Sequence, residues 1–299
     1  MSFKTASAIL RGKFLIEPEY AKSQLPLVLD IIKGNHVQET NSEDKAKMQV
    51  PKRVLIAGTQ SEVYKITPYQ STDRLAQNSI AMVDIIGPIL KYGDWCVYGT
   101  MEITDLIIRL VNSEKVKGIL LNIDSPGGEA NGTATLANAI REAGKLKPVL
   151  AVVQDGMAAS AGMWVASQAQ ELYVTQKTDS VGSIGAYCTL YDFQDWFEMN
   201  GIKVNEVYAP QSTDKNKVYR DAIDGNPADL QDDLKFLVNE FIGAVKTGRG
   251  ARLKANGDEP FTGKMYYAKE AIALGLIDGV KSLPAVVQRM NQLINLRNK

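Results

Sequence analysis

The chain has 299 residues, of which 45% are apolar and 23% charged, so it can bury a substantial core in one large domain with or without an appendage. Its 34 basic and 34 acidic residues cancel, which argues against nucleic acid as a partner. No apolar run approaches the roughly 18 residues of a membrane span, and the N-terminus lacks the apolar core of a signal peptide. We therefore expect a cytoplasmic protein.

The first 78 residues differ in composition from the rest. Apolar residues between Tyr20 and Lys33 are spaced as in a short amphipathic helix. Residues 34–50 have almost no apolar content, which predicts an exposed linker.

From Ser79 onward, β-branched runs alternate with segments of helical spacing. Strands are predicted over residues 79–90, 117–128 and 147–156, and a further strand with a glycine-rich turn over 171–185. The segments between them predict helices over residues 100–113, 132–146 and 157–170. This β-α-β-α order predicts a parallel sheet with right-handed crossovers.

Helices dominate after Pro210. Asn226 and Pro227 predict an N-cap and a first-turn proline for a helix that runs to Gly248. Further helices are predicted over residues 265–275 and 283–296.

We interpret the domain organisation in three parts. They are an N-terminal extension over residues 1–78, an α/β domain over 79–285 and a C-terminal helix over 286–299.

Residue counts narrow the possible chemistry. The single histidine, His36, lies in the polar linker, where it is badly placed to serve a serine or cysteine nucleophile. Cys96 and Cys188 are far apart and form neither a zinc-ligand spacing nor a disulfide framework. We expect no metal and no cofactor. A hydrolase of this composition needs Lys, Asp or Glu as its base, and lysine serves when burial favours the neutral amine.

Two segments are candidates for a catalytic site. Ser160 lies among small residues where a predicted strand turns into a helix, a setting that can expose a hydroxyl; tight helix packing is the alternative reading. Gly127 and Gly128 follow Asp124-Ser125-Pro126 at the end of another strand. Consecutive glycines can present backbone N–H groups to an oxyanion, although an ordinary tight turn would look the same.

Together, these segments resemble the signal peptide peptidase A family of serine proteases, which includes phage prohead proteases. The resemblance covers roughly residues 79–279. Four segments occur in the family's order: IDSPGG, MAASAGMWVAS, SVGSIGA and AKEAIALGLIDG, at residues 123–128, 157–167, 180–186 and 268–279. It implies an α/β fold of the Clp protease/crotonase type, built from repeated ββα units and followed by C-terminal helices. It also implies a homo-oligomer.

The resemblance assigns roles to particular residues. It implies Ser160 as the nucleophile, with oxyanion donors from Gly127, Gly128 and Ala161. The family usually has Gly-Gly after its nucleophile, whereas this chain has Ala161-Gly162; only the N–H is needed, so the departure costs little.

The base is implied to lie some fifty residues further on. Lys215 and Lys217 both qualify, and Lys215 is favoured by its Ser-Thr-Asp-Lys setting. The assignment requires that folding or contact with another copy buries Lys215. Ser183 is implied as a supporting residue that holds the lysine amine.

The expected function is a serine endopeptidase with a Ser–Lys dyad that cuts proteins or peptides with small or apolar side chains at the cleavage site. Phage capsid maturation, with a capsid scaffold protein as substrate inside a prohead, is favoured over a host cytoplasmic peptidase. Residues 1–78 are interpreted as a targeting, assembly or self-inhibiting element. The alternatives are a crotonase-type acyl-CoA enzyme and a catalytically inactive scaffold protein.

Overall fold

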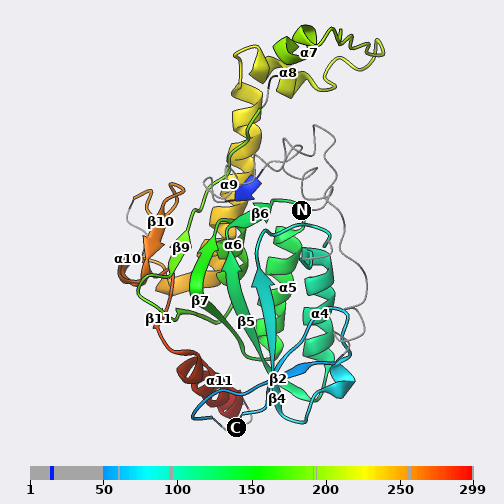
Figure 1. Cartoon of the computed structure of the whole chain (residues 1–299). Helices are drawn as coiled ribbons and strands as arrows, with labels where there is room; N and C mark the ends of the chain where they lie inside the picture. Colours follow the sequence, from blue (N-terminus) through cyan, green and yellow to red (C-terminus); the bar gives the residue numbers. More distant parts are fainter. Residues whose placement is uncertain are drawn as a thin grey trace.

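The computed structural model describes residues 14–16, 50–59, 61–93, 97–190, 192, 194–254 and 257–297. The helix predicted between Tyr20 and Lys33, the predicted linker apart from Val50, and His36 lie outside these residues. In the described part, a twisted sheet forms the centre and helices pack on both of its faces (Figure 1).

Within the described ranges, the main sheet has nine strands and confirms the predicted parallel arrangement. Its continuous path runs in the order β10-β9-β7-β5-β4-β3-β2, with β8 paired to β7 and β11 paired to β8. Only β2 and β10 pair antiparallel to their neighbours. The strands are β2 (Lys52–Val54), β3 (Val63–Lys65), β4 (Ser79–Ile86), β5 (Val116–Ser125), β7 (Val149–Ala159), β8 (Glu171–Val174), β9 (Ser180–Gly182), β10 (Met265–Tyr267) and β11 (Gly279–Val280).

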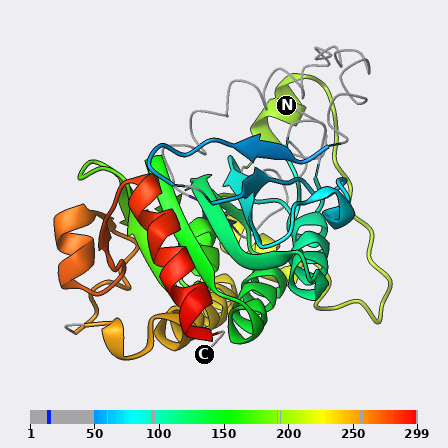
Figure 2. The same ribbon diagram turned by 90° about the horizontal axis from the view of Figure 1, so that it is seen from below.

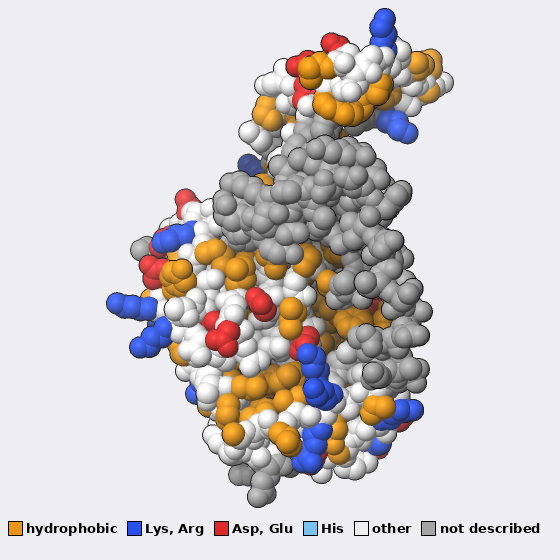
Figure 3. All heavy atoms as spheres, in the orientation of Figure 1, with side chains coloured by type: hydrophobic (Ala, Val, Ile, Leu, Met, Phe, Trp, Pro, Cys, Tyr) orange, Lys and Arg blue, Asp and Glu red, His pale blue; other side chains and the backbone are white. Residues whose placement is uncertain are grey.

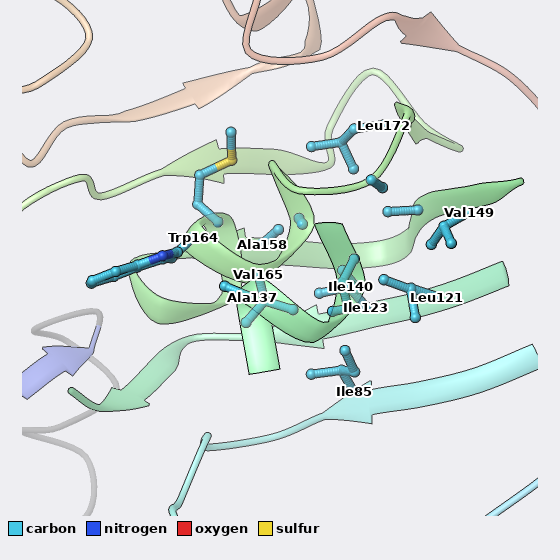
Figure 4. Close-up of a cluster of buried hydrophobic side chains, with 14 of the residues drawn as sticks. Ile85, Leu121, Ile123, Ala137, Ile140, Val149, Ala158, Trp164, Val165 and Leu172 are labelled. Atoms are coloured by element: carbon cyan, nitrogen blue, oxygen red, sulfur yellow. The ribbon is translucent and has the colours of Figure 1, made fainter. Parts of the chain in front are cut away.

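One face of the sheet is covered by α4 (Thr100–Asn112), α5 (Thr133–Leu146) and α6 (Ala161–Ala166). Each of the two longer helices turns a stripe of apolar residues inward at spacings of three and four, as predicted. Figure 4 shows side chains from the helices and the strands meeting in this core. Burying each such side chain stabilises the fold by about 1.5–3 kcal/mol, so the core fixes the strand ends that carry the candidate site.

The opposite face is covered by α11 (Leu283–Arg297), which lies across the strands when the molecule is seen from below (Figure 2). Its Val286, Val287 and Met290 are fully buried against apolar residues of the central strands. A side chain at Gly118 on β5 would come within 2.6 Å of the Met290 sulfur, so the helix approaches the sheet where this glycine leaves room.

Two predicted helices begin later than expected. Met157–Ala159 continue β7 as extended chain, and the helix starts only at Ala161. Met265–Tyr267 form β10, and α10 covers only Ala268–Ala273. Both segments pair with β9, and this pairing holds residues of helical pattern in the extended conformation.

A long arm projects from the body. It comprises α7 (Gln194–Met199), α8 (Lys217–Ile223) and the first half of α9 (Ala228–Arg249); we call residues 194–236 the arm. Figure 1 shows α9 rising out of the body and carrying α7 and α8 at its far end. Helix α9 begins at Ala228, one residue later than the predicted first-turn proline.

The segment before residue 79 also contributes strands. Strands β2 and β3 lie within the predicted N-terminal extension and extend the main sheet beyond β4. Strand β1 (Phe14–Ile16) pairs with β6 (Gly127–Glu129) in a separate two-stranded sheet. No described helix is both long enough and apolar enough to cross a membrane.

Candidate active site

The candidate site lies where β7 changes partner. Leu150–Val153 pair with β8, whereas Met157–Ala159 pair with β9. Between the two halves Asp155 takes a positive φ of 48°, and the amide of Met157 donates to Asp124 Oδ1 at 3.1 Å. A side chain at Gly156 would lie 2.5 Å from the Asp124 carboxyl carbon, so the chain passes closely over the end of β5. This close contact fixes the course of the last residues of β7 and hence the position of Ser160, which follows them.

Ser160 occupies a strained turn between β7 and α6. Its φ is 52° and its ψ −119°, and only 1% of its surface is exposed. Its amide donates to the Gly182 carbonyl at 2.8 Å, and its carbonyl accepts from the Trp164 amide at 2.9 Å. A non-glycine residue in this conformation costs about 1–3 kcal/mol, which the fixed strand and helix on either side must offset. A strand-turn-helix geometry of this kind presents the nucleophilic hydroxyl in α/β-hydrolases.

The residue after Ser160 begins a helix. Ala161 is fully buried at the first position of α6, where a backbone N–H has no acceptor within the helix. The next residue, Gly162, passes so close to Ser125 that a side chain there would lie 3.1 Å from its carbonyl oxygen. The small residues after the serine therefore let the positive end of α6 approach the end of β5.

The two glycines of β6 differ in what their amides do. The amide of Gly127 donates to Ser125 Oγ at 3.1 Å, and that hydroxyl donates to the Gly87 carbonyl at 2.8 Å. A side chain at Gly128 would lie 2.6 Å from the carbonyl carbon of Ile89, so only glycine fits. The Gly127 N–H donates within its own turn, whereas the Gly128 N–H faces the edge of β6 that pairs with β1, so Gly128 is the better placed of the two to offer an amide to a ligand that takes that edge.

Ser183 lies directly after the residue that accepts the Ser160 amide. Its φ is 52°, it is buried, and its own amide donates to the Lys264 carbonyl at 2.9 Å. The structure thus brings Ser183 and Ser160 to the same end of the sheet. The role of Ser183 in holding a lysine amine stays a prediction.

The lysines are not brought to the serine within one chain. Lys215 and Lys217 lie in the arm, and Figure 1 shows α8 at the far end of α9, well away from α6 and the end of β7. Lys215 is exposed, so the burial that its predicted role requires is not met by a single copy.

Lys217 is held as a cation. It forms an ion pair with Asp221 one helical turn away, and lies 4.0 Å from Asp229. The hydrogen bond and charge of Asp221 raise the pKa of Lys217 above its ordinary value. This pairing disfavours Lys217 as a base and leaves Lys215 as the better candidate.

Reasoning from the sequence missed two supporting groups, the Ser125 hydroxyl and the Asp124 carboxylate. Both belong to the Asp-Ser-Pro-Gly-Gly turn that was singled out for its glycines. Serine and aspartate at a turn often accept from nearby backbone amides, and that was the available signal.

The parallel sheet, with its glycine strand beside a serine turn, defines an α/β protein of the Clp protease type, and the Clp protease profile matches residues 92–178. The profile of peptidase family S49 matches residues 141–297, more than half of the chain. The chain belongs to peptidase family S49. This confirms the resemblance to the signal peptide peptidase A family stated from the sequence.

Relatives come from bacteria, archaea and phages. Capsid assembly protease C of Escherichia phage lambda is 24% identical over 309 residues, covering 98% of this chain and 66% of that protein. Protease 4 of Haemophilus influenzae is 27% identical, covering 76% of this chain and 37% of its own length. A Methanocaldococcus jannaschii protein is 30% identical, with 65% and 61% covered. The chain thus spans less than two thirds of each of these relatives.

Among solved structures, a 1510-N membrane-bound stomatin-specific protease is similar to this chain. It is 18% identical with a TM-score of 0.45, and the similarity covers 72% of this chain and 85% of that structure.

Proposed function

We propose that this protein is a serine endopeptidase in which Ser160 is the nucleophile and Lys215 the general base. The observation that carries the proposal is the buried, strained turn of Ser160 between β7 and the N-terminus of α6. Backbone strain of this kind persists only where the surrounding structure enforces it, and strained residues cluster at active sites. The turn that carries the nucleophile of α/β-hydrolases is one example. Membership of peptidase family S49 supports the same reaction class.

The oxyanion donors would be the amides of Gly128 and Ala161. One lies on a strand that packs against α6, and the other begins α6 itself. In a dry site, two fixed N–H groups aimed at a developing oxyanion are among the largest contributions to catalysis.

The base would come from a second copy of the chain. The arm carries Lys215 away from its own Ser160, and it displays large apolar side chains to solvent: Trp196, Met199, Ile202, Val204, Val207, Ile223 and Phe236. Figure 3 shows hydrophobic side chains gathered on this arm. Such a surface is typical of one that another protein covers. Covering it would bury Lys215 and favour its neutral amine.

The reaction would proceed in two stages. The neutral amine of Lys215 takes the proton of the Ser160 hydroxyl as its oxygen attacks a peptide carbonyl. The resulting ammonium then protonates the leaving amine, and water, deprotonated by the same lysine, releases the acyl group from the serine. These steps use only groups of the protein and water.

The biological setting we propose is phage capsid maturation, with a capsid scaffold protein as substrate. Its support is similarity along nearly the whole chain to a relative named as a capsid assembly protease. A second relative, 29% identical, is named a head-tail preconnector protein of Enterobacteria phage P21.

Mixing two inactive variants tests the proposal. Ser160→Ala and Lys215→Ala should each lower casein cleavage by at least about 10⁴-fold, because the two residues act as a unit. If the dyad forms between copies, unfolding and refolding the two variants together at equal amounts should restore about a quarter of wild-type activity. Lys217→Ala is the matched control and should stay active.

Other outcomes have definite meanings. Activity in Lys215→Ala together with loss in Lys217→Ala would assign the base to Lys217. Equal activity in wild type and Ser160→Ala would rule out the serine mechanism. Covalent labelling of Ser160 by a fluorophosphonate would count against a crotonase-type enzyme or an inactive scaffold.

A further inference from the structure

Strand β6 has two edges, and one of them is already used inside the body. The Ile89 amide donates to the Gly127 carbonyl at 2.8 Å, and the Glu129 amide donates to the Ile89 carbonyl at 2.8 Å. Backbone groups alternate in direction along a strand. The N–H and C=O of Gly128, between these two residues, therefore face the other edge.

The other edge is occupied by the N-terminal segment of the same chain. Strand β1 runs antiparallel to β6, with Leu15 opposite Gly128, Phe14 opposite Glu129 and Ile16 opposite Gly127. Figure 1 shows this short strand, in blue, beside β6. Ile16 is buried, with 5% of its surface exposed. The segment is thus seated by backbone pairing and by the buried side chain of Ile16.

This edge adjoins the candidate site. Strand β6 follows β5 after a single residue, and Ser125 at the end of β5 pairs with Ala158, two residues before Ser160. Strand β6 also packs against α6, whose N-terminus follows the serine. The amide of Gly128, which faces the edge that β1 covers, is the one we assign to the oxyanion. An extended peptide that reaches Ser160 would need the same backbone groups that β1 uses.

We propose that this edge of β6 is the docking site for an extended apolar peptide, and that Phe14–Ile16 is its internal occupant, competing with substrate. This rests on the proposed peptidase function. A strand edge binds one partner at a time through its N–H and C=O groups. Substrate must therefore displace β1, and the N-terminal segment lowers the apparent affinity of the site.

The pairing is short enough to be displaced. It spans three residues in a two-stranded sheet that is separate from the main sheet. Two short strands are marginally stable by themselves in water. The form with β1 paired to β6 (closed) and the form with β1 displaced (open) are therefore close in free energy. The fraction of molecules in the open form sets the apparent KM.

A proline at the central residue of β1 tests the competition. Leu15→Pro removes the backbone N–H opposite Gly128, so the proline cannot donate a hydrogen bond in the ladder between β1 and β6. In the full-length protein it should lower KM for a fluorogenic peptide by about five- to tenfold with kcat unchanged, because the open fraction rises. Leu15→Ala keeps the amide and is the matched control. Ile16→Asp, which places a charge at the buried position, should act in the same direction as Leu15→Pro.

A binding measurement separates this inference from the proposed chemistry. A fluorescein-labelled peptide with the sequence of residues 10–20 is titrated into full-length Ser160→Ala with and without Leu15→Pro, and anisotropy is recorded. We expect about five- to tenfold tighter binding when Leu15 is replaced. Equal affinity would overturn the competition, even if the wild type is labelled by fluorophosphonate and cuts casein. Tighter binding without labelling or cleavage in the wild type would keep the docking edge and overturn the peptidase.

Discussion

Ser160 and Lys215, which we propose act together, lie in regions of opposite character. The serine is buried in the body, with its amide and carbonyl both hydrogen-bonded and its backbone held in a strained conformation. The lysine lies on the arm, where most large apolar side chains face solvent. The body thus fixes the backbone conformation of Ser160, whereas the arm exposes an apolar surface around Lys215. A single chain therefore holds the proposed nucleophile in a fixed backbone geometry and leaves the proposed base exposed.

Helix α9 shows the same contrast along its length. Its second half buries Phe241, which stacks on Trp164 of α6 with ring centroids 4.9 Å apart, whereas Phe236 in its first half is 68% exposed. Within five residues, the same helix passes from a phenylalanine exposed on the arm to one buried in the body.

The largest expected effect on stability tests this boundary. Phe241→Ala should lower the free energy of unfolding by about 3–5 kcal/mol, because it opens a cavity beside α6. Phe236→Ala, the same change on the exposed half, should alter it by less than about 0.5 kcal/mol at protein concentrations too low for copies to associate. Denaturant titration of both variants, at low and at high protein concentration, measures the difference. A loss for Phe236→Ala that grows with concentration is expected if another copy covers the arm, and a loss equal to that of Phe241→Ala at every concentration would mean that Phe236 is packed within one copy.

Two glycines provide the next comparison. Gly128→Ala forces a side chain against the backbone of Ile89 and should lower kcat/KM by about 10²–10³-fold, because it displaces the amide that we propose as an oxyanion donor. Gly243→Ala in α9 meets nothing within 4 Å and should raise the free energy of unfolding by about 0.5–1 kcal/mol with activity unchanged. Wild-type kcat/KM in Gly128→Ala would remove Gly128 from the site.

Ion pairs give the smallest expected effect. Burial would raise the pKa of Glu171 in the body, but hydrogen bonds from Arg289 and Tyr173 outweigh it and hold the pKa below the usual value near 4.5. The stabilisation is therefore full above pH 4.5 and is lost as the pH falls through the lowered pKa. Arg289→Met should cost about 1 kcal/mol at pH 7 and progressively less toward pH 3.

The arm supplies the control for this pair. Asp221→Asn removes the partner of Lys217 on an exposed helix and should leave the free energy of unfolding unchanged within error at every pH. Denaturant titration from pH 3 to pH 7 checks both variants. A constant cost for Arg289→Met across this range would mean that its role is packing rather than charge.

The sequence was most informative where local pattern and tertiary packing agree. Helices α4 and α5 were predicted to within a residue or two, because their apolar stripes face a sheet that needs covering. The central strands β4, β5 and β7 were predicted for the same reason, whereas β3 and β11, which also pair parallel in the sheet, were not. Met157–Ala159 were predicted helical because their small residues fit a helix, yet pairing with β9 decides their conformation.

The candidate site divides along the same line. The Ser160 turn and the β6 glycines were found because strand, turn and helix are contiguous in sequence. The distance between Lys215 and Ser160 depends on the direction in which α9 leaves the body, which no local pattern encodes. The pairing of Phe14–Ile16 with Gly127–Glu129 joins segments far apart in the chain, and a three-residue apolar run does not reveal its partner.

The division of β7 between two partners has a consequence for how the site can be altered. Beyond Val153 the strand leaves β8 and joins β9, which in turn is held by β10. The end of β7, which precedes Ser160, is thus supported through β9 by Met265–Tyr267. These residues follow the arm in the sequence. An insertion in the arm lengthens the chain between β9 and β10 without changing how either strand pairs. The same insertion between β9 and Ser183 would disturb the pairing of β9 with β10. Natural variation in length should therefore accumulate in the arm and be rare where β7 changes partner.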